Sequence, residues 1–167
     1  MKATLHNGRE GSASHNERSW KDDKSGRDII AGPWTKWSEG QSLKQAEIKA
    51  YETLFGKHNK ETNENYKKKR HPEKVRTIRQ IYTGKKTRPL EQIIQIGDKN
   101  DHPKPEVFKA CVEDFLKRTE KELRERVPDH TARVVLLSAS IHYDETVPHA
   151  HLDYAFIGKD KNGNRTP

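Results

Sequence analysis

The chain has 167 residues, a length that suits one domain, and its formal net charge is +8. Only 30% of its residues are hydrophobic and 35% are charged, so any core must be small. The single cysteine, Cys111, excludes an internal disulfide, and no apolar run is long enough to span a membrane. We therefore expect a cytoplasmic protein in which residues 1–167 form one domain.

The first forty residues are rich in Gly, Ser, Asp and Lys and poor in hydrophobic anchors. They predict a short strand near Ala3–Leu5 and then a long irregular segment. Two tetrapeptides of the form H-N-x-R lie in this region, one beginning at His6 and one at His15. The second follows a run of small residues, GSAS at 11–14. A histidine in such a setting is ordinarily exposed and inert unless the fold brings it to other functional groups.

Residues 42–88 predict a basic helical segment. Ser42 and Gln45 form a capping box, and Leu43, Ala46, Ala50 and Leu54 recur at helical spacing until the pattern fades near Gly56. From 57 to 88 there are twelve Lys or Arg residues and three Glu. Such a patch favours nucleic acid as a partner, although a solvated charged helix has the same composition. The candidate DNA-binding residues are Lys67, Lys68, Lys69, Arg70, Arg76, Arg79, Lys85, Lys86 and Arg88, with Tyr66 and Tyr82 available for stacking on bases.

Residues 90–157 hold most of the expected core. Glu91 to Gly97 predicts a strand with Ile94 and Ile96 on one face. A helix over 105–126 follows, opened by Pro103 and Pro105. Its apolar stripe is wide and contains Val107, Phe108, Cys111, Val112, Phe115 and Leu116. We expect the Cys111 thiol to be buried within that stripe.

Two buried strands, 132–142 and 149–157, predict an antiparallel hairpin with a six-residue loop. Opposing His142 with His149 also opposes Ser140 with His151, so all three histidines project from one face. His149 and His151 are then about 7 Å apart at their Cα atoms, a spacing that imidazoles can close onto one ion. The simpler alternative is a hairpin with three exposed histidines, but three on one face favour a metal site.

Alternation of side chains along the two strands assigns each residue to a face. The face with the metal ligands is expected to hold Ala132, Val134, Leu136, Ser138, Ser140 and His142 on one strand, and His149, His151, Asp153 and Ala155 on the other. The predicted fold class is α+β, with an antiparallel sheet and helices packed on one face. The opposite face remains open for metal and DNA.

The segment from His142 to His151, HYDETVPHAH, resembles the H-x-D-E-x-x-P-H-x-H signature of plasmid mobilisation and recombination relaxases of the MobV (Pre/Mob) type. These proteins belong to the HUH endonuclease superfamily. Residues 11–18 resemble the first motif of the family, H-N-x-R behind a small-residue loop. The resemblance implies a relaxase-like fold and a metal-dependent nickase. Such an enzyme cuts one strand at a plasmid origin of transfer and forms a covalent protein–DNA intermediate.

The resemblance also implies roles for single residues. The nucleophile would be His15, which forms a phosphoramidate, with His6 as the alternative. Glu145 would accept its proton, Arg18 would contact the phosphate, and Asn16 would fix the tautomer of a neighbouring ring. Asp144 would orient a ligating histidine. Family practice implies Mn²⁺ or Mg²⁺ at the three histidines, whereas ligand preference alone also suits Zn²⁺, Ni²⁺ or Cu²⁺.

Two other functions remain open at the level of sequence. A rolling-circle replication initiator shares the HUH site but needs a tyrosine on a following helix, and Tyr154 lies only three residues after His151. A non-catalytic DNA-binding domain with a vestigial site is the second, because residues 28–33 lack the histidine of the family's next motif. Family members continue with a helix that covers the sheet. We therefore expect this chain to be truncated at its C-terminal end and to lack that helix.

Overall fold

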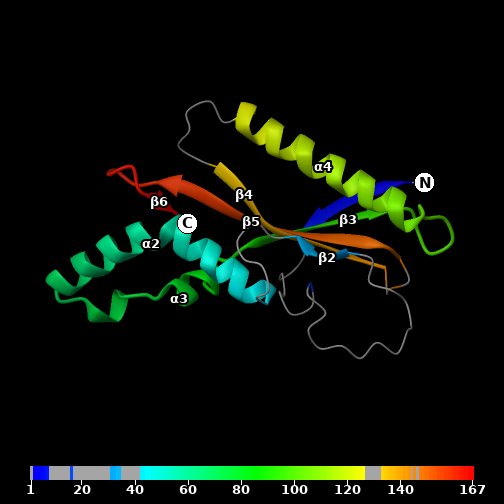
Figure 1. Cartoon of the computed structure of the whole chain (residues 1–167). Coiled ribbons are helices and arrows are strands. Elements are labelled where there is room, and N and C mark those ends of the chain that lie inside the picture. Colours follow the sequence, from blue (N-terminus) through cyan, green and yellow to red (C-terminus); the bar gives the residue numbers. More distant parts are fainter. Residues whose placement is uncertain are drawn as a thin grey trace.

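The centre of the molecule is an antiparallel β-sheet, seen edge-on in Figure 1. The computed structural model describes residues 2–7, 16, 31–34, 42–126, 133–143, 145 and 147–167. The strands are β1 (Ala3–Asn7), β2 (Ala31–Trp34), β3 (Leu90–Ile96), β4 (Arg133–His142), β5 (His149–Lys159) and β6 (Arg165–Thr166). Their order across the sheet is β1-β3-β5-β4-β2, and β6 pairs with the end of β5. The α+β class and the strands expected near Ala3 and Glu91 are confirmed.

Helices lie against both faces of the sheet, so the expectation of helices on one face is wrong. The helical elements are α2 (Leu43–Lys68), the short 3-10 turn η1 (Pro72–Lys74), α3 (Ile78–Tyr82) and α4 (Pro105–Arg126). Phe108 and Val112 of α4 pack against Ile141 and Leu152 on one face. On the other face, α2 and α3 pack against the far ends of β4 and β5 (Figure 1). The second face is therefore covered at one end and carries the histidines at the other.

A β-bulge in β4 separates these two regions and corrects the assignment of faces. The register of β4 and β5 shifts between Leu136 and Ser138. An extra residue in one strand reverses its alternation beyond that point. Val134 and Leu136 consequently pack on the α4 side, and Leu137 packs against α2 and α3. Ser138, Ser140 and His142 keep the predicted face, while Ala132 lies outside the described residues.

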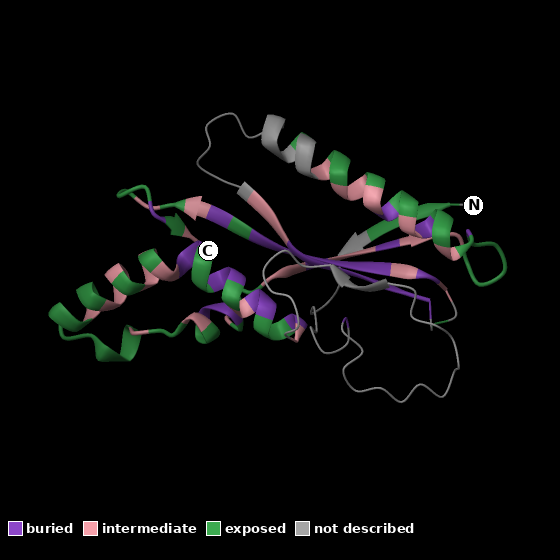
Figure 2. Cartoon of the chain, viewed as in Figure 1, coloured by how far each residue is buried: buried purple, intermediate pink, exposed green. Residues whose placement is uncertain are grey.

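The helix α2 is longer than its hydrophobic pattern predicts. The capping box of Ser42 and Gln45 is present, but the helix ends at Lys68 rather than near Gly56. Figure 2 shows its buried residues near one end and mainly exposed or half-buried residues at the other. The distal half is held by polar contacts, because His58 Nδ1 lies 2.8 Å from Asp160 and both polar atoms of the Asn63 amide bond to the backbone of Arg76.

The buried stripe of α4 is narrower than predicted. Phe108 and Val112 are fully buried, but Val107 is 53% exposed and Cys111 is exposed. The expectation of a buried Cys111 thiol is therefore wrong. A helix that lies on a sheet buries one row of side chains, and the neighbouring row faces solvent. In the part of the chain that the structure describes, no helix is long and apolar enough to span a membrane.

Candidate metal centre

The hairpin of β4 and β5 brings the three predicted histidines together on one face. His142 pairs with His149 and Ser140 pairs with His151, which is the register expected from the sequence. The ring centroids are 5.2 Å apart for His142 and His149, 4.7 Å for His142 and His151, and 4.9 Å for His149 and His151. One ligand atom from each residue lies within 4.8 Å of the others. The trio is therefore close enough to bind a single metal ion.

One nitrogen of each imidazole lies near an oxygen that accepts a hydrogen bond. His142 Nε2 is 3.1 Å from the backbone carbonyl of Asn16, and His149 Nδ1 is 2.9 Å from that of Val147. His151 Nδ1 is 2.8 Å from a carboxylate oxygen of Glu91. An N–H at these positions fixes the neutral tautomer and directs the lone pair of the opposite nitrogen away from the oxygen. With these tautomers, the atoms that could ligate an ion are Nδ1 of His142 and Nε2 of His149 and His151.

Beside the histidines, on the same face of the sheet, lies a group of buried carboxylates that the sequence did not indicate as a unit. Glu91 of β3 pairs with Asp153 of β5 in the sheet, and Glu47 of α2 packs over the same face. The Asn16 side-chain amide donates to Asp153 at 2.8 Å and to Glu91 at 3.3 Å. Ser138 donates to Glu47 at 2.6 Å and lies 3.4 Å from Asp153, so polar contacts run from the metal centre into the core.

Burial and mutual repulsion control the ionisation of these acids. Burial raises the pKa of Asp153 well above its ordinary value, and the charges of Glu47 and Glu91 raise it further. Burial likewise raises the pKa of Glu47, although hydrogen bonds from Ser138 and Tyr82 partly oppose the shift. Carboxyls in this setting hold protons more tightly than exposed ones, because the charged form loses its hydration. The acidic group beside the histidines therefore carries less negative charge than its residue types suggest.

The structure describes only some of the residues to which the resemblance gives roles. Glu145 lies beside the ligands as expected, with Oε2 3.8 Å from Nε2 of His149. Asn16 contacts a histidine through its backbone carbonyl, whereas its side chain contacts the buried acids. His15, Arg18 and Asp144 lie outside the described residues. The alternative nucleophile, His6, is in β1, where its backbone pairs with Ile93, which in turn pairs with His151.

The basic segment, residues 67–88, begins in the last turn of α2, and its candidate DNA-binding cations lie on the surface. All nine candidate DNA-binding residues are exposed: Lys67, Lys68, Lys69, Arg70, Arg76, Arg79, Lys85, Lys86 and Arg88. Tyr66 is half-buried, but Tyr82 is buried and donates to Glu47 at 2.7 Å. The expectation that Tyr82 stacks on bases is therefore wrong. The Tyr82 ring packs in the core between α2, α3 and the sheet, and its hydroxyl donates a hydrogen bond to the buried Glu47.

Comparison with family models, curated proteins and solved structures finds no match to this chain in any of the three.

Proposed function

We propose that this chain is a metal-dependent DNA relaxase that nicks one strand at a plasmid origin of transfer. The observation that carries the proposal is the trio of His142, His149 and His151, whose tautomers are set by their oxygen neighbours. Three neutral nitrogens on one side of an ion leave coordination positions for phosphate oxygens. Mn²⁺ or Mg²⁺ fits the proposed chemistry, and Zn²⁺, Ni²⁺ or Cu²⁺ fits the donor atoms at least as well.

The covalent step assigns the chain's own residues to bond making and proton transfer. A ring nitrogen of His15 attacks the scissile phosphorus, a P–N bond forms, and the P–O3′ bond breaks with its electron pair on the 3′ oxygen. Glu145, next to His149, takes the proton that the imidazole loses, and the 3′ oxygen takes a proton from water. A metal ion held by His142, His149 and His151 would supply positive charge that offsets the negative charge of the phosphate in the transition state. Arg18 provides a further positive charge at the phosphate.

The buried position of Tyr154 favours a histidine nucleophile over the catalytic tyrosine that a replication initiator needs. Its ring packs in the core with α4, and the residue is 4% exposed. A phenol in that position is on the opposite face of β5 from His151, since successive residues of a strand alternate. It therefore does not reach a phosphate held by the histidines.

Nicking of supercoiled plasmid DNA in the presence of Mn²⁺ tests the proposal. The wild-type chain should convert supercoiled DNA to open circles, and His142→Ala should abolish this conversion but keep most DNA affinity, because the basic segment is unchanged. If His142→Ala nicks DNA at the wild-type rate, the three-histidine site has no role in the mechanism. A wild-type chain that binds DNA but leaves it closed would instead be a non-catalytic DNA-binding domain.

The covalent adduct identifies the nucleophile in the same assay. Denaturing gels should show protein attached to the 5′ end of the cut strand for the wild type and none for His15→Ala. An adduct that survives in His15→Ala and disappears in His6→Ala would move the nucleophile to the first H-N-x-R tetrapeptide.

A further inference from the structure

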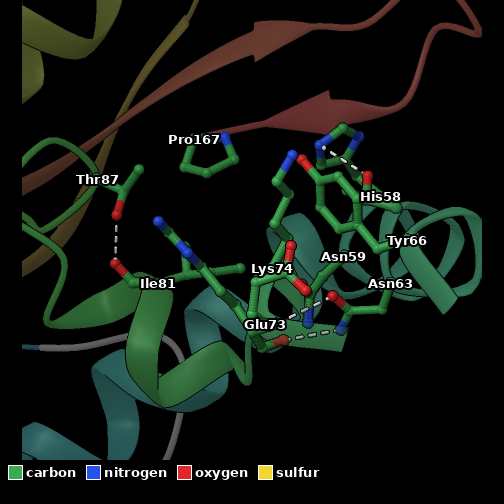
Figure 3. A pocket seen from close by; sticks show the side chains of 11 residues that line it. His58, Asn59, Asn63, Tyr66, Glu73, Lys74, Ile81, Thr87 and Pro167 are labelled. Carbon is green, nitrogen blue, oxygen red and sulfur yellow. Dashed lines mark hydrogen bonds between the residues drawn. The ribbon is translucent and has the colours of Figure 1, made fainter. Parts of the chain in front are cut away.

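The distal half of α2 forms one wall of a cavity of about 470 Å³ (Figure 3). His58, Asn59 and Tyr66 line it from the helix, Lys74 lines it from η1, and Ile81 and Thr87 lie on the opposite side (Figure 3). A cavity of this size is in the range that holds small organic ligands, and one nucleotide fits that range. Most side chains that line the cavity are polar or charged, with Ile81 and Pro167 as the apolar members, and the Tyr66 ring offers a flat surface with a polar edge.

The walls of this cavity are fixed by hydrogen bonds within the protein. Asn63 Nδ2 donates to the Arg76 carbonyl at 2.8 Å, and the Arg76 backbone N–H donates to Asn63 Oδ1 at 3.0 Å. His58 Nδ1 lies 2.8 Å from Asp160, and Thr87 donates to the carbonyl of Ile81 at 2.6 Å. A ligand that enters therefore meets walls that are already formed, which reduces the entropy lost on binding.

The chemistry of the lining favours an anionic ligand with a flat ring. Tyr66 presents a half-buried aromatic ring, and the Lys74 Nζ lies 6.0 Å from its centroid (Figure 3). Arg76 adds a second cation, while the lining carboxylate of Glu73 is 3.1 Å from Nδ1 of His71. Bases stack on aromatic side chains regardless of sequence, and neighbouring cations bind the phosphate.

We propose that this cavity binds one unpaired nucleotide of a DNA strand, with its base stacked on Tyr66 and its phosphate at Lys74 and Arg76. The identification of the strand as DNA rests on the proposed function. The position of the cavity relative to the proposed cleavage site can be estimated along β5. His58 contacts Asp160, which is nine residues beyond His151 along β5 and the turn that follows it, a span of up to about 30 Å in an extended chain. The bound nucleotide therefore lies several positions away from the scissile phosphate.

Fluorescence anisotropy with a labelled 16-nucleotide thymidine oligomer tests this proposal. The titrations contain EDTA, so that neither metal binding nor cleavage contributes. Tyr66→Ala should weaken binding by about 5-fold to 150-fold, the range found when a stacking aromatic is removed. Tyr66→Phe keeps the ring and should stay within about twofold of the wild type. Phe156→Ala removes a ring that is 55% exposed outside the cavity, and should bind as the wild type does.

Two further ligands separate stacking from charge and a strand from a free nucleotide. An abasic oligomer of the same length keeps its phosphates, so Tyr66→Ala and the wild type should bind it equally. Thymidine monophosphate should bind more weakly than the oligomer, and equal affinity would make the cavity a site for free nucleotides. Lys74→Ala should weaken oligomer binding more than Lys60→Ala, which removes an equal charge from an exposed position outside the cavity.

The outcomes distinguish this proposal from the nuclease. Wild-type affinity in Tyr66→Ala, with unchanged thermal unfolding, would overturn the nucleotide site and leave nicking untouched. Conversely, a wild-type chain that fails to nick, while Tyr66→Ala still loses oligomer affinity, would overturn only the nuclease. A loss that is equal for the abasic and thymidine oligomers would also contradict stacking on Tyr66.

Discussion

Glu91 sets the orientation of His151 by accepting a hydrogen bond from its Nδ1 in a buried setting. The two side chains are 5% and 6% exposed, so water does not compete for the contact. A carboxylate in this position holds the ring in one orientation and directs the opposite nitrogen toward an ion, and such partners strengthen metal binding. The same pair of residue types occurs at the surface, where Glu73 is 3.1 Å from His71. Because that second pair is exposed to solvent, a substitution of Glu73 serves as the matched control for a substitution of Glu91.

We predict that Glu91→Gln weakens Mn²⁺ binding by about 10-fold and that Glu91→Ala weakens it by about 100-fold. The amide oxygen of Gln still accepts the hydrogen bond but without the charge, whereas Ala removes the contact. Isothermal titration calorimetry measures both affinities. Glu73→Gln should bind the ion as the wild type does. Equal Mn²⁺ affinity in Glu91→Gln and wild type would show that Glu91 does not act on the metal centre.

Sequence alone predicted the histidines of the site but not its acidic layer. The register of His142 and His149 follows from a six-residue loop and from alternation, both of which are local. Asp153 was placed on the correct face for the same reason. The contact of Asp153 with the Ser138–Glu47 pair depends on the packing of α2 against that face. The sequence of the hairpin itself does not indicate this packing. The role of Glu91 likewise required the pairing of β3 with β5.

At the scale of elements, the limits of prediction have physical causes. The bulge beside Ser138 was not predicted, because apolar residues precede it on both faces of β4 and leave no break in the pattern. The end of α2 was misplaced because its distal half is held by Asp160 and Asn164, which are about a hundred residues away in sequence. The strand β2 was missed because Gly32 and Pro33 are unusual in strands, although an edge strand tolerates Pro.

The turn that follows β3 gives a test of the fold at this scale. Gly97 has a φ of +84°, and a Cβ there would lie 2.0 Å from the backbone carbonyl oxygen of Asp101. Gly163 has a φ of +76°, but nothing lies within 4 Å of its Cβ position. Both positions disfavour side chains through φ, and only Gly97 adds a steric clash with backbone.

We predict that Gly163→Ala lowers the free energy of unfolding by about 1 kcal/mol and that Gly97→Ala lowers it by about 3 kcal/mol or more. The larger loss at Gly97 reflects displacement of the turn that joins β3 to the loop before α4. Urea unfolding followed by circular dichroism measures both values. Equal losses in the two variants would mean that the turn around Asp101 shifts without cost.

At the scale of the whole molecule, the metal centre and the basic segment lie toward opposite ends of the sheet face that α2 partly covers. The histidines are at the start of β5, and the distal half of α2 contacts residues beyond its end (Figure 1). Under the proposed function, a DNA strand that follows this face would meet cations at one end and the candidate ligands at the other. The charge of the segment would then contribute to affinity, and the histidines would contribute to the reaction.

We predict that replacing Lys67, Lys68, Lys69 and Arg70 with Ala flattens the dependence of log affinity on log salt concentration for single-stranded DNA. Up to four phosphate contacts are lost, so the slope should change by up to about 3. The control replaces Lys99, Lys104, Lys109 and Lys117, which lie in α4 or the loop before it, and removes the same charge. Equal slopes in the two variants would mean that net charge, rather than the basic segment, determines affinity.

Anomalous diffraction from crystals grown with Mn²⁺ tests the central claim most directly. We predict one strong peak that is bonded to Nδ1 of His142 and to Nε2 of His149 and His151. A peak at other residues, or imidazoles that turn apart with no peak between them, would contradict the metal centre and the nuclease proposed from it.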